Sequence, residues 1–246
     1  MPKQSKSIEI QMDVVININK PEGITSQGVV NRVKRMLCIK KAGHTGTLDP
    51  FATGVLPVCT GKATKLFSRL INSDKEYIAA IKIGESTDTE DSSGTIIQAV
   101  NTSHITEGMV MDALQRFKGS ISQIPPMYSA LKLNGTPLYK LARRGIIVER
   151  KARIITIHHI EILGIALPFI TLHIHCSAGT YIRTLAYDIG SVLGVGGHLV
   201  SLSRIRAGQF RIEDSIRLDE LASYTKEGRT PKGMYSLEQV LLTMSN

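Results

Sequence analysis

Residues 43–65 read GHTGTLDPFATGVLPVCTGKATK and contain a single acidic residue, Asp49. Gly43, Gly46 and the Asp49-Pro50 step predict a loop rather than a helix or a strand. Proline disfavours the right-handed helical region for the residue before it, so Pro50 directs Asp49 toward an extended backbone. The sequence therefore predicts one carboxylate presented on a tight loop.

This stretch fits two other patterns in part. Asp-Pro-Phe-Ala-Thr also fits a helix N-cap with proline at the first helical position, and on this local pattern alone the cap is favoured over a catalytic acid. Gly61-Lys62 is reminiscent of a phosphate-binding loop, but Leu56 stands where that motif has its first glycine, and Ala63 stands where it has Ser or Thr. We expect no nucleoside triphosphate site.

Composition indicates a protein with a sizeable core. The chain has 246 residues, of which 42% are hydrophobic, enough for one large domain or two small ones. It has no run of 18 apolar residues, and its N-terminus, MPKQSKSIEIQMD, lacks the apolar core of a signal peptide. Cys38, Cys59 and Cys176 are odd in number and far apart, as is typical of reduced thiols. We expect a soluble cytoplasmic protein.

The charge balance points to a polyanionic partner. Thirty basic and 21 acidic residues give a net charge of +9. A basic cluster, with only Glu149 to oppose it, comprises Lys140, Arg143, Arg144, Arg150, Lys151 and Arg153. Such a cluster is often only a solvated face, but here a surface that contacts phosphates is favoured.

Hydrophobic patterns predict a mixture of strands and helices. Strands are expected at residues 14–19, 77–84, 95–100, 154–163 and 169–176. Helices are expected after a cap at Thr25 or Ser26, and at residues 105–117, 138–144 and 181–193. Because the two kinds of element do not alternate regularly, we predict an α+β fold with a mixed, largely antiparallel sheet flanked by helices.

The stretch 43–65 resembles the signature of the TruB family of pseudouridine synthases, which isomerise uridine at position 55 in the T-arm of tRNA. Further motifs of this family match in order: KPEGITS at 20–26, KEY at 75–77, PPMYSALKLNGTPLYKLARRG at 125–145, CSAGTYIR at 176–183 and LVSLSRIRAGQF at 199–210. The last block departs from the family's usual double arginine, since Ser203 precedes Arg204. The resemblance covers residues 20–210.

The resemblance implies three catalytic residues. Asp49 corresponds to the family's nucleophile, Arg183 to the arginine that pairs with it, and Tyr77 to the tyrosine that stacks on the target base. Arg183 would lie in the first turn of a helix, where the dipole disfavours a cation, so an anion is expected beside it. An arginine fork would hold a carboxylate ionised and oriented.

The resemblance also implies substrate-binding residues. Tyr181 would lie beside the detached base, His44 would fill the gap that the flipped nucleotide leaves, and Leu202 would line the pocket with apolar surface. Lys20 could be structural or could contact a phosphate, and the sequence leaves both open.

The domain organisation follows from the same resemblance. Residues 1–210 would form the catalytic domain, with an inserted thumb at about 124–152 that closes on RNA through Lys132, Lys140, Arg143 and Arg144. Residues 211–246 would form a short tail, too short for the RNA-binding PUA domain that many relatives carry.

No cofactor or metal is expected, because pseudouridine formation oxidises nothing and transfers no group in. His173 and His175 share one face of the strand at 169–176, and His158 and His159 lie nearby in the sequence. No acid or cysteine completes a ligand set at the usual spacing, so a metal site is not predicted.

Three functions are compatible with the sequence. They are a stand-alone tRNA pseudouridine synthase, a guide-RNA-dependent catalytic subunit, and a non-catalytic module that binds or folds RNA. Asp49 together with Arg183 favours an enzyme, because a pure RNA binder has no need of a carboxylate facing phosphates. We expect tRNA as the partner, with no obligate protein partner and no membrane.

Overall fold

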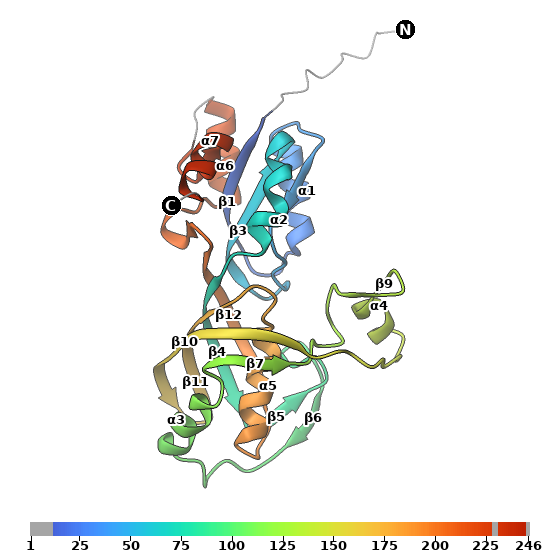
Figure 1. Cartoon of the computed structure of the whole chain (residues 1–246), viewed down its shortest axis with the longest axis vertical. Helices are drawn as coiled ribbons and strands as arrows, with labels where there is room; N and C mark the ends of the chain where they lie inside the picture. The colour runs from blue at the N-terminus through green and yellow to red at the C-terminus, as the bar shows by residue number, and fades with distance from the viewer. Residues whose placement is uncertain (1–11, 228–230, 245–246) are drawn as a thin grey trace. The chain divides into compact units, whose positions relative to one another are not determined.

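The computed structural model describes residues 12–227 and 231–244 (Figure 1). Residues 1–11, which make up most of the N-terminal stretch tested for a signal peptide, lie outside this range. The chain forms two compact units, one made of the described residues up to Ser73 and from Ser203 onward, the other of Asp74–Leu202. Among the described residues, no helix combines the length and apolar character needed to cross a membrane.

The first unit contains a mixed sheet. Strand β1 (Val14–Lys20) pairs antiparallel with β14 (Met234–Ser236) and with β3 (Thr53–Thr60). β3 also pairs antiparallel with β2 (Ala42–His44) and parallel with the end of β12 (Gly197–Ala207), which bears β13 (Phe210–Arg211). The predicted mixed, largely antiparallel sheet is confirmed.

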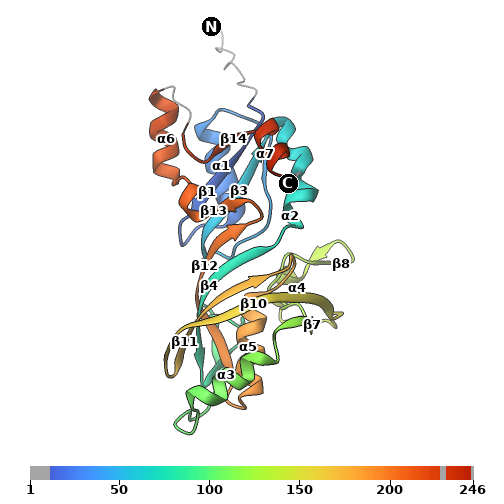
Figure 2. The same cartoon turned by 60° about the vertical axis from the view of Figure 1, so that its left-hand side comes forward.

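Helices flank the sheet of the first unit (Figure 2). They are α1 (Ser26–Met36), η1 (Gly61–Leu66), α2 (Phe67–Ile71), η2 (Ile212–Asp214), α6 (Leu218–Glu227) and α7 (Leu237–Thr243). Thr25 is the N-cap of α1, because its side chain accepts a hydrogen bond from the Gly28 amide. Val29, Val30 and Val33 are fully buried, as the apolar face of α1 predicts.

The second unit is built on an antiparallel sheet in the order β4 (Lys75–Ile83), β11 (Phe169–Cys176), β10 (Arg153–Ala166), β7 (Gly119–Gln123). Two small hairpins pair β5 (Glu85–Thr87) with β6 (Ile96–Ala99) and β8 (Lys132–Leu133) with β9 (Thr136–Pro137). The helices are α3 (Glu107–Gln115), α4 (Leu138–Ala142) and α5 (Ile182–Val192). The predicted alternation of β11 is confirmed, since Ile170, Leu172, Ile174 and Cys176 are fully buried.

Several elements differ from the expectation. Residues 53–60, expected within a loop-rich stretch, form β3, whose residues after Thr53 are all buried. A strand buried on both faces has a continuous apolar sequence and lacks the alternation that reveals a strand. β7, with the polar sequence GSISQ, was also missed, and α4 ends at Ala142 rather than at residue 144.

The C-terminal residues belong to the core of the first unit. Val240 of α7 is fully buried in a cluster that includes Val15 of β1 and Phe210 of β13. The ring of Phe210 meets the ring of Tyr235 edge to face, with centroids 5.5 Å apart. These contacts attach α7 and β14 to the sheet that carries β1 and β3.

Candidate active site

Asp49 lies in a loop between β2 and β3. After Pro50 the chain makes a turn, in which the Ala52 amide donates to the Asp49 carbonyl at 3.1 Å, and β3 then begins at Thr53. No helix starts at Pro50 in this described segment, so the helix-cap interpretation of Asp49 is wrong. The pairing of β3 with its neighbours overrides the local preference for a cap.

Lys20 supports this loop from β1. Its side chain is fully buried, and its ammonium donates to the carbonyl oxygens of Pro21, Pro50 and Ala52 at 3.0, 3.1 and 2.6 Å. Burial lowers the pKa of Lys20 to about 8, and the charges of Asp49 and then Glu22 oppose the shift. Of the two roles that the sequence left open, these contacts favour the structural one.

Arg204 supports the loop from β12. Its Nε donates to the Val55 carbonyl at 2.7 Å and its Nη2 to the Gly46 carbonyl at 3.1 Å, and the side chain is buried. Gly54 makes this approach possible: its φ is +99°, and a Cβ there would overlap the Arg204 backbone. The sequence contained Arg204 in a family motif but gave no sign that it reaches the Asp49 loop.

Two further contacts fix the loop. Ser26 Oγ accepts from the Leu48 amide at 2.8 Å and donates to the Leu48 carbonyl at 2.9 Å, while the Thr45 amide donates to the Pro57 carbonyl. His44 precedes them at the end of β2, where burial and then the charge of Arg204 lower its pKa. Both effects favour the neutral form of His44, and a hydrogen bond with the Gly46 backbone opposes them.

Arg183 is fixed in the second unit, in the first turn of α5. It is buried, its Nη1 donates to the Thr89 carbonyl at 3.0 Å, and its Nη2 donates to the Tyr128 carbonyl at 2.8 Å. Asp91 Oδ2 lies 3.6 Å from Nη1. An anion was expected beside Arg183, and Asp91 is one such anion. Sequence analysis did not identify Asp91 as this partner. The pairing of Arg183 with Asp49 stays a prediction.

The loop after β5 holds Asp91 in place. Thr89 Oγ1 and the Ser93 amide donate to Asp91 Oδ1 at 2.8 and 2.9 Å. Glu90 adopts a left-handed φ of 63°, and its carboxylate accepts from Thr184 of α5 at 2.7 Å. The sequence did not mark this loop as functional, because small hydrogen-bonding residues around two acids are also common in ordinary surface loops.

Glu90 and Asp188 are two partly buried acids that influence each other's charge. Burial raises the pKa of Glu90, whereas the Thr184 hydrogen bond and the Arg183 charge oppose the rise. Burial, and then the charge of Glu90, raise the pKa of Asp188 on α5 to about 6. Asp188 therefore stays partly protonated in mildly acidic solution.

The residues expected to surround the base also lie in the second unit. Tyr77 is buried on β4, where it is in register with Ile174, and Leu202 is buried on β12. Tyr181 is the N-cap residue of α5, and Gln123 binds both its amide and its carbonyl, at 2.8 and 3.0 Å. The roles of these three residues in binding the base stay predictions.

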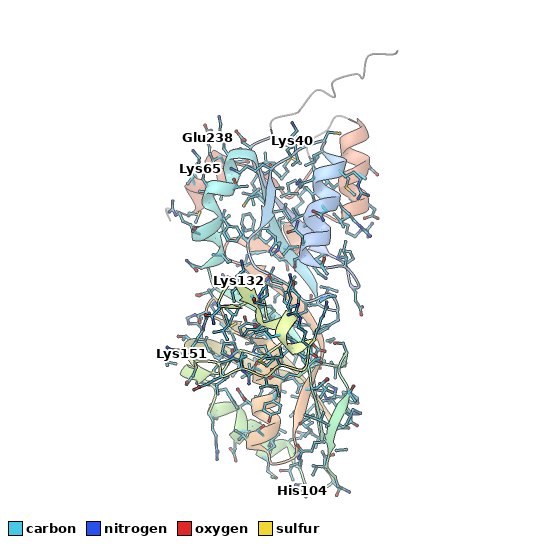
Figure 3. The ribbon with its side chains drawn as sticks, turned by 90° about the vertical axis from the view of Figure 1, so that its right-hand side faces the viewer. Lys40, Lys65, His104, Lys132, Lys151 and Glu238 are labelled. Carbon is cyan, nitrogen blue, oxygen red and sulfur yellow. The ribbon has the colours of Figure 1, made fainter. Side chains whose placement is uncertain are left out.

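The thumb segment, residues 124–152, connects β7 to β10 and carries β8, β9 and α4 (Figure 1). Arg150 Nη1 donates to the Pro125 carbonyl at 3.2 Å, which joins the two ends of the segment. Figure 3 shows it from the side that carries Lys132 and Lys151. The basic residues that the resemblance assigned to RNA binding are all exposed: Lys132, Lys140, Arg143 and Arg144.

One group of side chains could hold a metal ion. Ligand atoms of Asp74, His158 and His175 all lie within 4.8 Å of one another. The spacing of residues in the sequence did not reveal this acid, because Asp74 is distant in sequence from both histidines.

Comparison with known proteins identifies the class. Residues 34–182 match the model of the TruB family pseudouridylate synthase N-terminal domain, and residues 183–246 match the tRNA pseudouridylate synthase B C-terminal domain. The protein of Saccharophagus degradans named tRNA pseudouridine synthase B is 51% identical over 210 residues, which cover 84% of this chain and 67% of that protein. Its namesake in Clostridium tetani is 50% identical over 210 residues, covering 85% and 73%.

Solved structures agree. A chain of a Cbf5-Nop10-Gar1 complex has a TM-score of 0.73 and 32% identity, over 94% of this chain and 62% of its own length. A chain of the archaeal box H/ACA sRNP Nop10-Cbf5 complex has a TM-score of 0.70 and 30% identity, over 97% and 64%. The present chain thus spans about three fifths of those chains. Together these findings define an isomerase of the pseudouridine synthase class. The chain belongs to the TruB family of pseudouridylate synthases.

Proposed function

We propose that this chain isomerises uridine 55 in the T-arm of tRNA to pseudouridine, with Asp49 as the nucleophile. The observation that carries the proposal is the support of the Asp49 loop by two buried cations, Lys20 and Arg204. A nucleophile needs a fixed position and a negative charge. The hydrogen bonds to the loop carbonyls fix the position of Asp49. The nearby positive charges favour the ionised form of its carboxylate.

The reaction breaks the bond between the ribose C1′ and N1 of uracil and forms a bond from C1′ to C5. The C5 proton leaves, and N1 gains a proton, so the product is an isomer of the substrate. Asp49 supplies a transient covalent partner, either at the ribose or at the ring. No electron is gained or lost, so neither a cofactor nor a metal is needed for the chemistry.

The other residues would act around this step. Arg183 would pair with Asp49 and hold its carboxylate in orientation, since an arginine fork matches a carboxylate. The target base must leave its stack to be reached. Tyr77 would then stack on it, Leu202 would line the pocket, and Tyr181 would assist removal of the C5 proton. His44 would fill the gap that the flipped nucleotide leaves.

The exposed lysines and arginines of the thumb would contact phosphates of the T-arm. Identity supports a stand-alone enzyme of the cytoplasm over a guide-dependent subunit. Relatives named tRNA pseudouridine synthase B are 46–51% identical, whereas the chains solved with Nop10 are 30–32% identical. We therefore propose that no guide RNA and no obligate protein partner are required.

Tritium release tests the proposal. Purified chain is mixed with unmodified tRNA that carries tritium at C5 of its uridines, in EDTA and without any guide RNA. Release of about one tritium per tRNA is expected, because only one uridine loses its C5 hydrogen. The matched control is the same tRNA with cytidine at position 55, which should release none. Equal release from both RNAs, or a need for guide RNA, would refute the proposal.

A further inference from the structure

The face of β11 opposite the buried core carries a group of histidines. His173 and His175 point away from the core on alternate residues of this strand. β10 adds two more through a bulge: its register passes from Ile157 opposite Cys176 directly to His159 opposite His175. His158 is the extra residue of this bulge. A bulge redirects a side chain, and the side chain of His158 meets that of His175, with ring centroids 4.7 Å apart.

An acid from a third segment completes this group. Asp74 immediately precedes β4, the other neighbour of β11. Its Oδ2 lies 3.1 Å from Nε2 of His158 and 3.7 Å from Nε2 of His175. The two imidazoles therefore converge on a single carboxylate oxygen, and all three ligand atoms lie within 4.8 Å of one another.

We propose that Asp74, His158 and His175 bind a divalent transition ion, with Zn²⁺ as the best match. Imidazole nitrogen and carboxylate oxygen are ordinary zinc ligands, and bond lengths of about 2.0–2.1 Å in a tetrahedron place neighbouring ligand atoms about 3.3 Å apart. The observed 3.1 and 3.7 Å bracket that separation. The side chains are 28–42% exposed, so solvent can supply the fourth ligand.

The neighbouring histidines make a different arrangement. His173 contacts Glu76 at 3.1 Å and Glu161 at 3.9 Å, while His159 contacts Glu161 at 3.7 Å. These contacts join the residues in pairs, and the residues do not form a compact set of three ligand atoms within the described chain. They therefore provide matched controls of the same residue type on the same sheet face.

Bound metal would link three neighbouring segments of the second unit, namely β10, β11 and the residue before β4. An ion that binds the folded state and not the unfolded chain raises stability by mass action. The role assigned to it is structural, which separates this inference from the proposed activity. Removal of the ion should lower the thermal midpoint and leave turnover on tRNA unchanged at ordinary temperature.

Calorimetric titration of the EDTA-treated, dialysed full chain with Zn²⁺ tests the inference. A Cys38→Ser background is used because the Cys38 thiol is exposed and could itself bind zinc. One Zn²⁺ per chain is expected. His158→Gln and Asp74→Asn should each weaken binding by about 10–100-fold or more, the range known for disturbed metal sites. His159→Gln and His173→Gln should bind as tightly as the background protein.

A spectroscopic measurement makes the result independent of heat signals. Co²⁺ in place of Zn²⁺ should give visible absorption bands of a four-coordinate site, and His158→Gln should abolish them. His158 is exposed, so this variant is expected to fold normally, which a far-UV spectrum checks. Absence of stoichiometric binding would overturn the inference. Equal weakening by His159→Gln or His173→Gln would also overturn it, since the ion would then be spread over a histidine-rich surface.

Discussion

The ammonium of Lys20 lies 2.6 Å from the carbonyl oxygen of Ala52. The same group donates to the carbonyls of Pro21 and Pro50, so its three protons all have acceptors. Two of these acceptors belong to the loop that carries Asp49. The position of the Asp49 loop thus depends on a cation from β1. Replacing that cation should affect both the stability of the protein and its catalytic activity.

Replacing Lys20 by methionine should destabilise the protein. Methionine fills a similar volume but donates no hydrogen bond, so the buried carbonyl of Ala52 and the part-buried carbonyl of Pro50 lose this donor. The free energy of unfolding, measured with urea at pH 7, should fall by about 1–3 kcal/mol. Lys62→Met is the control, because Lys62 is exposed and its ion pair with Asp13 is long at 3.8 Å. The effect of this control substitution should stay within about 0.5 kcal/mol. Equal effects would show that the buried contacts contribute nothing.

Asp49→Asn should abolish turnover and leave tRNA binding within a few-fold of the original. Asparagine keeps the shape of the side chain but is not a nucleophile, whereas phosphate contacts made elsewhere dominate affinity. Single-turnover kinetics and filter binding measure the two quantities on the same preparation. Asp112→Asn on the exposed side of α3 should alter neither. Normal turnover by Asp49→Asn would remove Asp49 from the mechanism.

Arg183→Lys should reduce turnover sharply despite keeping the charge. One ammonium cannot reproduce the two guanidinium donors that reach the Thr89 and Tyr128 carbonyls, which lie on different segments. Stability should also fall by about 1–3 kcal/mol, because one of these part-buried carbonyls loses the hydrogen bond from the guanidinium. The exposed Arg116→Lys serves as the control. Full activity of Arg183→Lys would show that charge alone suffices.

Asp188→Asn should stabilise the protein at pH 7 and have little effect at pH 4. The pKa of Asp188 is raised from 3.8 to about 6, so between these values the folded state binds more protons than the unfolded state. Stability attributable to this group therefore falls as pH rises through that window. Urea unfolding of both proteins at several pH values measures the difference. A gain in stability that is independent of pH would exclude the ionisation of Asp188 as its cause.

The thumb should be mobile in the free protein and ordered with RNA. Its helix α4 has only Leu138 buried, and its exposed basic residues repel one another until phosphates neutralise them. Amides of residues 124–152 should exchange hydrogen quickly in the free protein and slow markedly with tRNA. Amides of β11 should be protected in both states and serve as the internal reference. Strong protection of the thumb without tRNA would identify it as a rigid part of the fold.

Local patterns predicted much of the fold. Alternation located β11, Thr25 marked the start of α1, and the glycines with Pro50 predicted the Asp49 loop. These signals lie within a few residues of the feature that they predict. The local prediction of a helix cap at Asp49 was wrong for a related reason. Its signal was local, whereas the pairing of β3 with β1 and β12 determines the extended conformation of the residues that follow.

The supports of the candidate site could not be predicted in this way. Arg204 is separated from Gly46 by 158 positions and from Val55 by 149, and Arg183 from Thr89 by 94. The three residues of the proposed metal site come from three segments and meet only after a bulge redirects His158. Such contacts depend on the register of paired strands, and one sequence alone does not fix register across long separations.

The order of the units along the chain has a consequence for protein synthesis. Asp74–Leu202 is continuous, whereas the first unit needs residues on both sides of it. Domains fold as the nascent chain leaves the ribosome, N-terminal parts first. The second unit can thus fold while β1 and β3 still lack residues 203–207 of β12, strand β14 and the Arg204 guanidinium. Asp49 is translated early, but its loop gains full support only after the ribosome has passed residue 204, so chains terminated before that point carry the proposed nucleophile without the contacts that hold its loop.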